Sequence, residues 1–121
     1  MKYIIVVFLG GGLGAALRYL IAHLLGSIHL PLPTFIANML GCFLIGLSMP
    51  LFLARADSAT MRLFIVTGFL GGLTTFSTFT YETIQLFENT TSLFAVANIF
   101  GNVICGLALA MLGMWMARIM L

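Results

Sequence analysis

The sequence predicts an all-α integral membrane protein with four transmembrane helices, the third of them broken near the middle of the membrane. Two observations carry this fold class. The 121 residues are 62% hydrophobic and 7% charged, whereas about a quarter of the residues of a soluble domain are charged. The five basic and three acidic residues also leave uncharged runs at 3–17, 19–54, 63–81 and 89–117. Because a spanning helix needs about 20 apolar residues, we expect a single domain, residues 1–121, with spans near 3–25, 32–54, 61–86 and 93–119.

The first span contains the small-residue segment GGGLGAALRY, from Gly10 to Tyr19. Small side chains let another helix backbone approach closely, so this segment predicts a packing face. The apolar run continues past Arg18 without a cleavage pattern, which favours a transmembrane helix over a signal peptide. Arg18 itself has two open interpretations: it extends to the membrane interface, or it lines a water-filled vestibule and attracts anions.

The second span begins with Pro33, which suits the start of a helix. Thr34, Asn38 and Gly41 follow at spacings of four and three and therefore share one helix face. An amide in hydrocarbon must find a partner. Asn38 either bonds a neighbouring helix or lines a hydrated path.

The third span contains Gly68 to Tyr81, GFLGGLTTFSTFTY, which has three glycines, six hydroxyl side chains and no charge. Such a cluster at membrane depth indicates a broken helix that lines a protected polar pathway. Phe76 and Phe79 share a face among these hydroxyls, and the positive edge of a phenyl ring can face an anion. Glu82 is interpreted as a solvated carboxylate at a helix end.

The fourth span places Asn98 and Asn102 on one face at i and i+4, with glycines available for close packing. Together with Asn38 and the hydroxyls, these amides form a neutral track that suits a small anion better than a proton. Cys42 and Cys105 lie inside spans without acidic or histidine partners, so neither a disulfide nor a metal site is expected.

The basic residues set the expected orientation. Four spans put Lys2, Arg55, Arg62 and Arg118 on one side and Arg18 toward the other, so the positive-inside rule predicts cytoplasmic termini. The stretch Arg55–Arg62 is predicted to be the turn between spans two and three, and His29 is expected to be an interfacial residue without a special role. The charges form no patch, so a nucleic-acid partner is not expected.

Four segments together resemble the Fluc family of fluoride channels, also called CrcB: GGGLGAALRY, TFIANMLG, GFLGGLTTFSTFTYE and NIFGN. The resemblance covers essentially the whole chain. It implies a multi-pass protein of the bacterial inner membrane that exports fluoride passively. It also implies an antiparallel, dual-topology dimer with two pores, formed with a second copy or with a paralogue and surrounded by lipid.

The resemblance also implies roles for particular residues. Phe76 and Phe79 would flank fluoride, Asn38 would be the pore asparagine, and Arg18 would sit in an entrance vestibule. Hydroxyl donors near the track would be Thr34, Ser77 and Thr78. The helix break would lie at Gly71 to Thr74, and backbone carbonyls of Gly71 and Thr74 from both subunits would hold a structural Na⁺ there, at the dimer centre. The family's fourth-helix serine has no counterpart, because Cys105 and Gly106 stand there.

Three alternatives are weaker. A proton-coupled exporter of the small multidrug-resistance type has similar length, but it needs a carboxylate deep in the first helix, and residues 3–17 contain no acid. A noncatalytic assembly subunit leaves the hydroxyl-rich third span unexplained. An enzyme is the least favoured class, because no nucleophile, base and orienting group occur at usable spacing.

Overall fold

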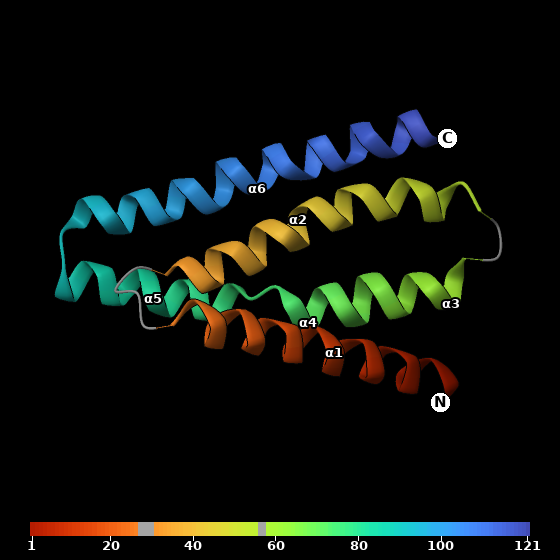
Figure 1. Ribbon diagram of the computed structural model, residues 1–121, viewed down its shortest axis with the longest axis horizontal. Helices are drawn as coiled ribbons and strands as arrows, with labels where there is room; N and C mark the ends of the chain where they lie inside the picture. Colours follow the sequence, from red (N-terminus) through yellow and green to blue (C-terminus); the bar gives the residue numbers. More distant parts are fainter. Residues whose placement is uncertain (27–30, 56–57) are drawn as a thin grey trace.

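The computed structural model describes residues 1–26, 31–55 and 58–121, which form four long spans running back and forth (Figure 1). Three spans are single helices, namely α1 (Lys2–Leu25), α2 (Leu32–Leu53) and α6 (Ser92–Met120). The third is segmented into α3 (Ala59–Arg62), the π-helix η1 (Leu63–Leu70), α4 (Gly71–Leu73) and α5 (Phe76–Asn89). All four spans are long and apolar enough to cross a membrane, as the composition predicted.

The two termini lie at the same end of the bundle as the end of α2 and the start of α3 (Figure 1). The end of α1, the start of α2 and the junction of α5 with α6 lie at the opposite end. Residues 27–30 and 56–57 of the predicted connections, which include His29 and Asp57, fall outside the described part of the chain. Of the predicted turn Arg55–Arg62, the second half is helical, because α3 begins at Ala59.

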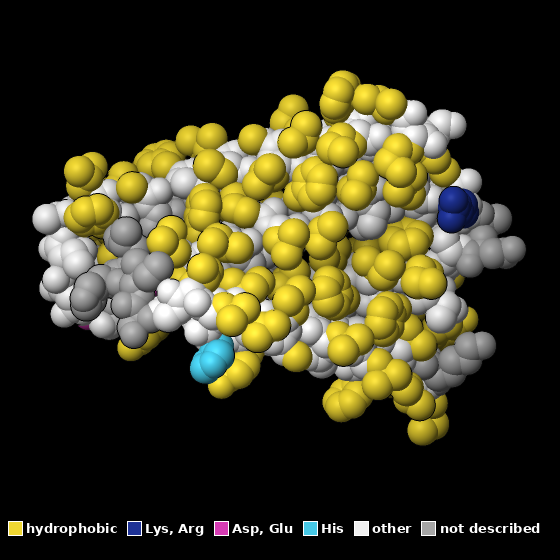
Figure 2. All heavy atoms as spheres, viewed as in Figure 1, with side chains coloured by type: hydrophobic (Ala, Val, Ile, Leu, Met, Phe, Trp, Pro, Cys, Tyr) yellow, Lys and Arg dark blue, Asp and Glu magenta, His cyan; other side chains and the backbone are white. Residues whose placement is uncertain are grey.

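Hydrophobic side chains cover much of the face of the bundle shown in Figure 2. Large side chains such as Phe8, Phe100 and Trp115 are more than half exposed, while the buried apolar core is small and centres on Ala37, Leu70 and Leu73. Lipid chains are as apolar as these side chains, so removal of apolar surface from water does not hold the helices together in a membrane. Close packing and interhelical hydrogen bonds must do so.

Glycines supply the close packing between α1 and the first half of the third span. A Cβ atom on Gly10 would collide with the carbonyl oxygen of Phe64, and one on Gly14 would collide with that of Phe69. Gly72 meets α1 in the same way, at the carbonyl oxygen of Gly11. The prediction of a packing face on the first span is confirmed.

Close contacts at glycines also join α2 to α6, at the end of the bundle that holds the termini. A Cβ on Gly46 would collide with the carbonyl oxygen of Ala110, and one on Gly113 would collide with that of Phe43. These contacts fix two of the long helices against each other. The asparagines of both helices, Asn38 of α2 and Asn98 and Asn102 of α6, lie toward the other end.

The third span is broken, as predicted, but at a different place. Thr74 (ψ 153°) and Thr75 (φ −149°, ψ 122°) are extended, whereas Gly71–Leu73 is helical. The prediction that the break begins at Gly71 is therefore wrong. Gly72 lies in this helical turn, and the close approach of the Gly11 carbonyl of α1 explains why a residue without a side chain stands there.

Before the break, η1 is wound as a π-helix, which the sequence did not predict. The N–H of Gly71 donates to the carbonyl of Val66, five residues back. Wide π-turns occur often at functional sites. Here only the short helix α4 separates the wide segment from the break.

Candidate functional site

The break is held by the amide of Asn38. Its Oδ1 accepts from the backbone N–H of Thr75 at 2.9 Å, and its Nδ2 donates to the carbonyl oxygen of the same residue at 3.3 Å. The Asn38 amide thus supplies the acceptor that the Thr75 N–H has lost, and it adds a second donor to the Thr75 carbonyl, which as the N-cap carbonyl also accepts the first bond of α5. Because an unpaired backbone group in the membrane costs several kcal/mol, Asn38 is what makes the extended conformation at Thr75 tenable.

A ladder of amides continues from Asn38 to the far half of α5. Asn38 donates its second hydrogen to Asn102 Oδ1 at 3.2 Å, and Asn102 donates to Asn98 Oδ1 at 3.1 Å. Asn98 then donates to Thr83 Oγ1 at 2.8 Å, and Thr83 donates to the Phe79 carbonyl at 2.7 Å. The predicted shared face of Asn98 and Asn102 is confirmed. The ladder links α2, α6 and α5 through uncharged groups alone.

A hydroxyl cluster caps the start of α5. The backbone N–H of Thr78 donates to Thr75 Oγ1 at 3.3 Å, so Thr75 is the N-cap residue. The Thr75 hydroxyl donates to Thr78 Oγ1 at 3.0 Å and lies 3.3 Å from Ser77 Oγ. A hydroxyl has one hydrogen, and Thr75 gives its hydrogen to Thr78, so Ser77 must donate to Thr75. Within this cluster the hydrogen of the Thr78 hydroxyl remains free.

The two phenylalanines lie beside the break on one wall of a cavity of about 420 Å³. The ring centroids of Phe76 and Phe79 are 5.6 Å apart with the ring planes at 45°. Asn38, Gly71 and Thr74 line the same cavity. Phe76 is 78% exposed, so its ring is open to whatever covers this face of the bundle.

A second cavity, of about 480 Å³, lies toward the end of the bundle where α1 ends and α2 begins. Arg18, Thr34, Thr78 and Glu82 line it. The Thr34 hydroxyl donates to Glu82 Oε1 at 2.8 Å. The other oxygen of Glu82 and the Nε of Arg18 are buried and have no hydrogen-bond partner among the described residues. Both charged groups therefore present a free polar atom near this cavity.

The interpretation of Glu82 as a solvated carboxylate at a helix end is wrong. The residue sits in the middle of α5, which continues to Asn89, and its carboxylate is half-buried against Thr34. Glu82 follows Thr75 by about two helical turns, which places both on the face that meets α2. The spacing between Thr75 and Glu82 was the sequence signal that could have predicted the contact of Glu82 with α2.

The break also frees backbone carbonyls at the end of α4, those of Gly71 and Thr74 among them. In a continuous helix the carbonyls of Gly71 and Thr74 would accept from the N–H groups of Thr75 and Thr78. Those two N–H groups donate instead to Asn38 Oδ1 and Thr75 Oγ1. Carbonyl oxygens without donors are suitable ligands for a hard cation. No group of three acidic, histidine or cysteine side chains that could hold a metal occurs among residues 1–26, 31–55 and 58–121.

The structure thus separates the predicted site residues into two groups. Phe76, Phe79 and Asn38 meet at the break together with Gly71 and Thr74, while Arg18, Thr34 and Thr78 meet in the second cavity. Ser77 lines neither cavity and contributes to the cap of α5. Thr75 and Thr83 were not singled out from the sequence, because nothing in a run of hydroxyls tells which one bonds to another helix.

Comparison with known proteins identifies one family and many relatives. Residues 5–114 match the family model described as CrcB-like protein, Camphor Resistance (CrcB). A protein of Clostridium perfringens named fluoride-specific ion channel FluC is 44% identical over 120 residues, which cover 96% of this chain and 94% of the relative. Proteins of the same name from Methanococcus aeolicus and Phocaeicola vulgatus are 43% and 39% identical, covering 85% and 98% of this chain and 85% and 100% of the relatives.

Proposed function

The chain belongs to the CrcB family, and from this premise we propose that it is a fluoride channel that lets F⁻ leave the cell passively across the inner membrane. The observation that carries the proposal is the uncharged hydrogen-bonding lining around the break, between Asn38, the hydroxyl cluster and the phenyl pair. A channel performs no covalent chemistry, so the protein is not an enzyme. The relatives compared above point to a prokaryotic, and we expect a bacterial, membrane.

The physical demand on such a channel is to replace water around a compact anion. Born solvation makes removal of an ion from water cost on the order of tens of kcal/mol. Hydroxyl, amide and ring-edge groups can offset this cost when they converge on a narrow path. A membrane potential of about 100 mV, negative inside, drives a monovalent anion outward with about 2.3 kcal/mol. Passive flow is therefore sufficient for export.

We assign the second cavity as the entrance vestibule, with Arg18 raising the local concentration of anions. Thr34 has donated its only hydrogen to Glu82, and Asn38 has used both of its amide hydrogens. Thr78 retains a free hydroxyl hydrogen and lines the vestibule. Thr78 is thus the donor that is free to bind an arriving fluoride. Thr34 and Asn38 use their hydrogens to hold neighbouring segments together, and they donate to the ion only when those hydrogen bonds are exchanged for bonds to fluoride.

Beyond the vestibule, Phe76 and Phe79 would receive the ion between their ring edges. Their tilt of 45° directs the two ring edges differently, and a positive edge rather than a negative face attracts an anion. Because Phe76 is mostly exposed in one chain, a complete pathway needs a second chain to close it. An antiparallel dimer with two pores, formed by two copies or by paralogues, provides this closure.

A structural Na⁺ fits the freed carbonyls. Gly71 and Thr74 offer oxygens that lack their helical donors, and two copies would double the number of ligands at a common centre. These residues would hold the ion where the broken third spans of the two copies meet. The ion would stabilise that contact and take no part in conduction.

The proposed function is tested by fluoride efflux from liposomes that contain the purified chain. We expect fluoride to leave, chloride to be retained under the same conditions, and the flux to be independent of an imposed proton gradient. Equal movement of the two halides would reject fluoride selectivity. Flux that requires a proton gradient would favour a proton-coupled exporter.

A further inference from the structure

His23 adjoins the face of α1 that lines the vestibule. It stands in the last turn of α1, about one helical turn beyond Tyr19 and about 7 to 8 Å along the helix axis beyond Arg18. An ion that enters from this end of the bundle therefore reaches the level of His23 before that of Arg18. The α1 positions that line the vestibule are Ala15, Arg18, Tyr19, Ala22 and, directly after the helix, Gly26.

The imidazole of His23 is stacked on the ring of Tyr19. The two ring centroids are 6.1 Å apart and the ring planes meet at 14°. Because Tyr19 lines the vestibule, the stack holds the imidazole at the edge of that cavity. The face of a tyrosine ring attracts a cation at about this distance, so a protonated imidazole keeps its place. Both side chains are exposed, so the imidazole can exchange protons with water at this end of the bundle.

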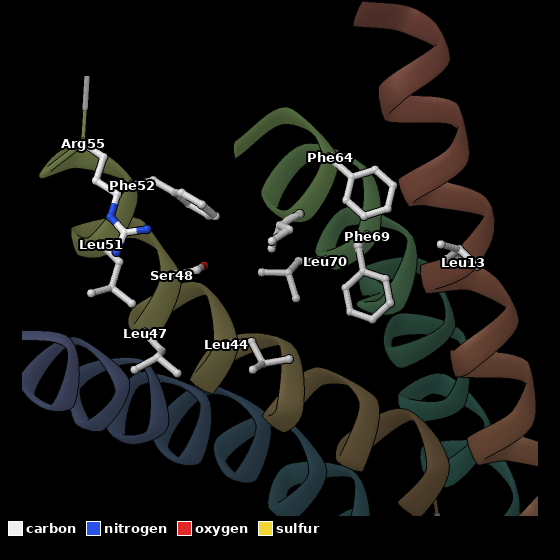
Figure 3. Close-up of a pocket in the computed structure, with 11 residues that line it drawn as sticks. Leu13, Leu44, Leu47, Ser48, Leu51, Phe52, Arg55, Phe64, Phe69 and Leu70 are labelled. Carbon is white, nitrogen blue, oxygen red and sulfur yellow. The ribbon is translucent and has the colours of Figure 1, made fainter. Parts of the chain in front are cut away.

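Positive charge is scarce around the vestibule. The other arginines belong to the opposite end of the bundle: Arg62 lies in α3 and Arg118 in the last turn of α6. Arg55 follows α2 and lines an apolar cavity between α2 and η1 (Figure 3). Among the described residues, Arg18 and His23 are therefore the two side chains at the vestibule end that can carry a positive charge.

The charge balance of the vestibule depends on the proton of His23. Imidazole is the side chain that ordinarily gains or loses its charge between pH 5 and 8. The titratable or charged groups around it are Arg18 and Tyr19 on α1 and Glu82 on α5, and the vestibule-lining residues of α2 do not titrate. The guanidinium of Arg18 and the carboxylate of Glu82 cancel in formal charge. A protonated His23 therefore makes the vestibule net positive.

We propose that His23 is a second anion-collecting residue of the vestibule, which acts with Arg18 when its imidazole is protonated and so raises fluoride flux in acid surroundings. The proposal rests on the proposed function and adds to it one residue and a response to pH. As the pH falls, the imidazole gains a positive charge and the local concentration of fluoride rises. As the pH rises, the charge and the gain in flux are both lost.

The size of the effect follows from Coulomb's law. One unit charge at about 10 Å from an ion in water changes the local concentration of that ion about twofold. Salt screens the interaction, because the Debye length falls from about 30 Å at 0.01 M to about 3 Å at 1 M. The response to pH should therefore be present in dilute salt and nearly absent in concentrated salt.

An anchor at the membrane surface is the competing role of the stacked pair. Tyrosine is enriched where a membrane meets water, and a neutral imidazole would serve such an anchor equally well. The anchor would leave the current independent of the proton on His23. The position of Tyr19 in the wall of the vestibule favours a role in collecting ions.

The proposal is tested by fluoride current across planar bilayers that contain the full chain, because neutral HF carries no current. Every variant carries His29→Gln, which leaves His23 as the only histidine. The current at about pH 5.5 is divided by the current at about pH 8, with both solutions changed together. We expect a ratio of about two in about 10 mM NaF, and a ratio near one when about 1 M of a salt with a large, impermeant anion is added.

Substitutions at His23 separate its contribution from that of Glu82, whose protonation would change the current in the same direction. His23→Gln should bring the ratio in dilute salt close to one, and any remainder belongs to Glu82. His23→Arg should carry the larger current at both pH values, because its charge is permanent. The matched control adds Ile4→His to His23→Gln, since Ile4 is 72% exposed at the opposite end of α1. An unchanged ratio in His23→Gln, a ratio that ignores salt, or a ratio restored from Ile4→His would overturn the proposal.

The outcomes separate this proposal from the proposed function. A fluoride current that does not respond to pH would overturn the role of His23 and leave the fluoride channel standing. The absence of fluoride current at both pH values, in the unsubstituted chain and in His23→Arg alike, would overturn the fluoride channel and the role of His23 with it.

Discussion

The two halves of the third span are built on different principles. Before the break, η1 and α4 lie with bare backbone against the glycines of α1, and their side chains are almost all apolar. After the break, α5 is held by hydrogen bonds from its hydroxyls and from the amides of α2 and α6. The contrast teaches that the first half anchors the helix and the second half presents polar groups. Substitutions before the break should remove folded protein, and those after it should remove flux.

The largest effect is expected at Gly14, because the contact there is backbone against backbone. Gly14→Leu forces a side chain into the carbonyl of Phe69, and overpacking of this kind costs about 1–3 kcal/mol or more. We expect loss of the monodisperse peak in detergent chromatography. Gly12→Leu is the matched control, since nothing lies within 4 Å of a Cβ at that position. Equal behaviour of the two variants would break the distinction between the halves.

The next largest effect is expected at Asn38, which serves both halves at their junction. Asn38→Leu leaves the N–H of Thr75 without a partner and removes one of the two donors to its carbonyl, and an unsatisfied group costs about 1–3 kcal/mol. We expect a lower thermal midpoint together with at least about a tenfold loss of fluoride flux, equivalent to about 1.4 kcal/mol of barrier.

A charged replacement at the same position separates the two roles of this amide. Asn38→Asp keeps an acceptor for the Thr75 N–H and adds a negative charge that repels an anion. Flux should fall as far as in the leucine variant while the thermal midpoint falls less. A conducting aspartate variant would remove Asn38 from the pathway.

The phenyl pair should affect flux without affecting stability. Phe76→Ile changes a ring that is 78% exposed, so the thermal midpoint should be nearly unchanged. Fluoride flux should fall about tenfold because a branched alkyl group has no positive edge. Phe100→Ile on α6 alters an equally apolar, exposed ring and serves as the control. Normal flux through the Phe76 variant would contradict a role for the ring edge.

The smallest effect is expected at Thr78, where one hydrogen is at stake. Thr78→Val keeps the shape of the side chain but removes the free hydroxyl hydrogen together with the oxygen that accepts from Thr75, and flux should fall about threefold. Thr78→Ser should conduct normally. Thr80→Val tests specificity, since the Thr80 hydroxyl is already bonded to the Phe76 carbonyl. The comparison between the halves is sharpened if the thermal midpoint stays constant across this series.

The sequence was sufficient for the coarse architecture. Uncharged runs separate the spans, and the cluster of Gly71, Gly72 and the following threonines indicated a broken third helix. It could not place the break, because a glycine that permits a break and a glycine that permits close packing look the same in one dimension. Only the contact of Gly72 with the Gly11 carbonyl tells them apart.

The sequence predicted which residues form the candidate site, but it did not predict which atoms they contact. Spacing put Thr34, Asn38 and Gly41 on one face, and all three indeed meet the third span, at Glu82, Thr75 and Thr74. Which atom each one contacts depends on the rotation and depth of a neighbouring helix. Neither is encoded in local periodicity, so the bond between Thr34 and Glu82 was missed.

The extended residues Thr74 and Thr75 have an electrical consequence. A helix carries a partial positive charge at its first turn and a partial negative charge at its last, so an interruption in mid-membrane exposes both ends of opposite sign within a few residues. The carbonyl end of α4 suits a cation and the amide end of α5 suits an anion, although no formal charge is present at the break. Backbone amides do not titrate in the physiological range. The attraction they exert in the middle of the membrane therefore stays constant when the acidity on either side changes.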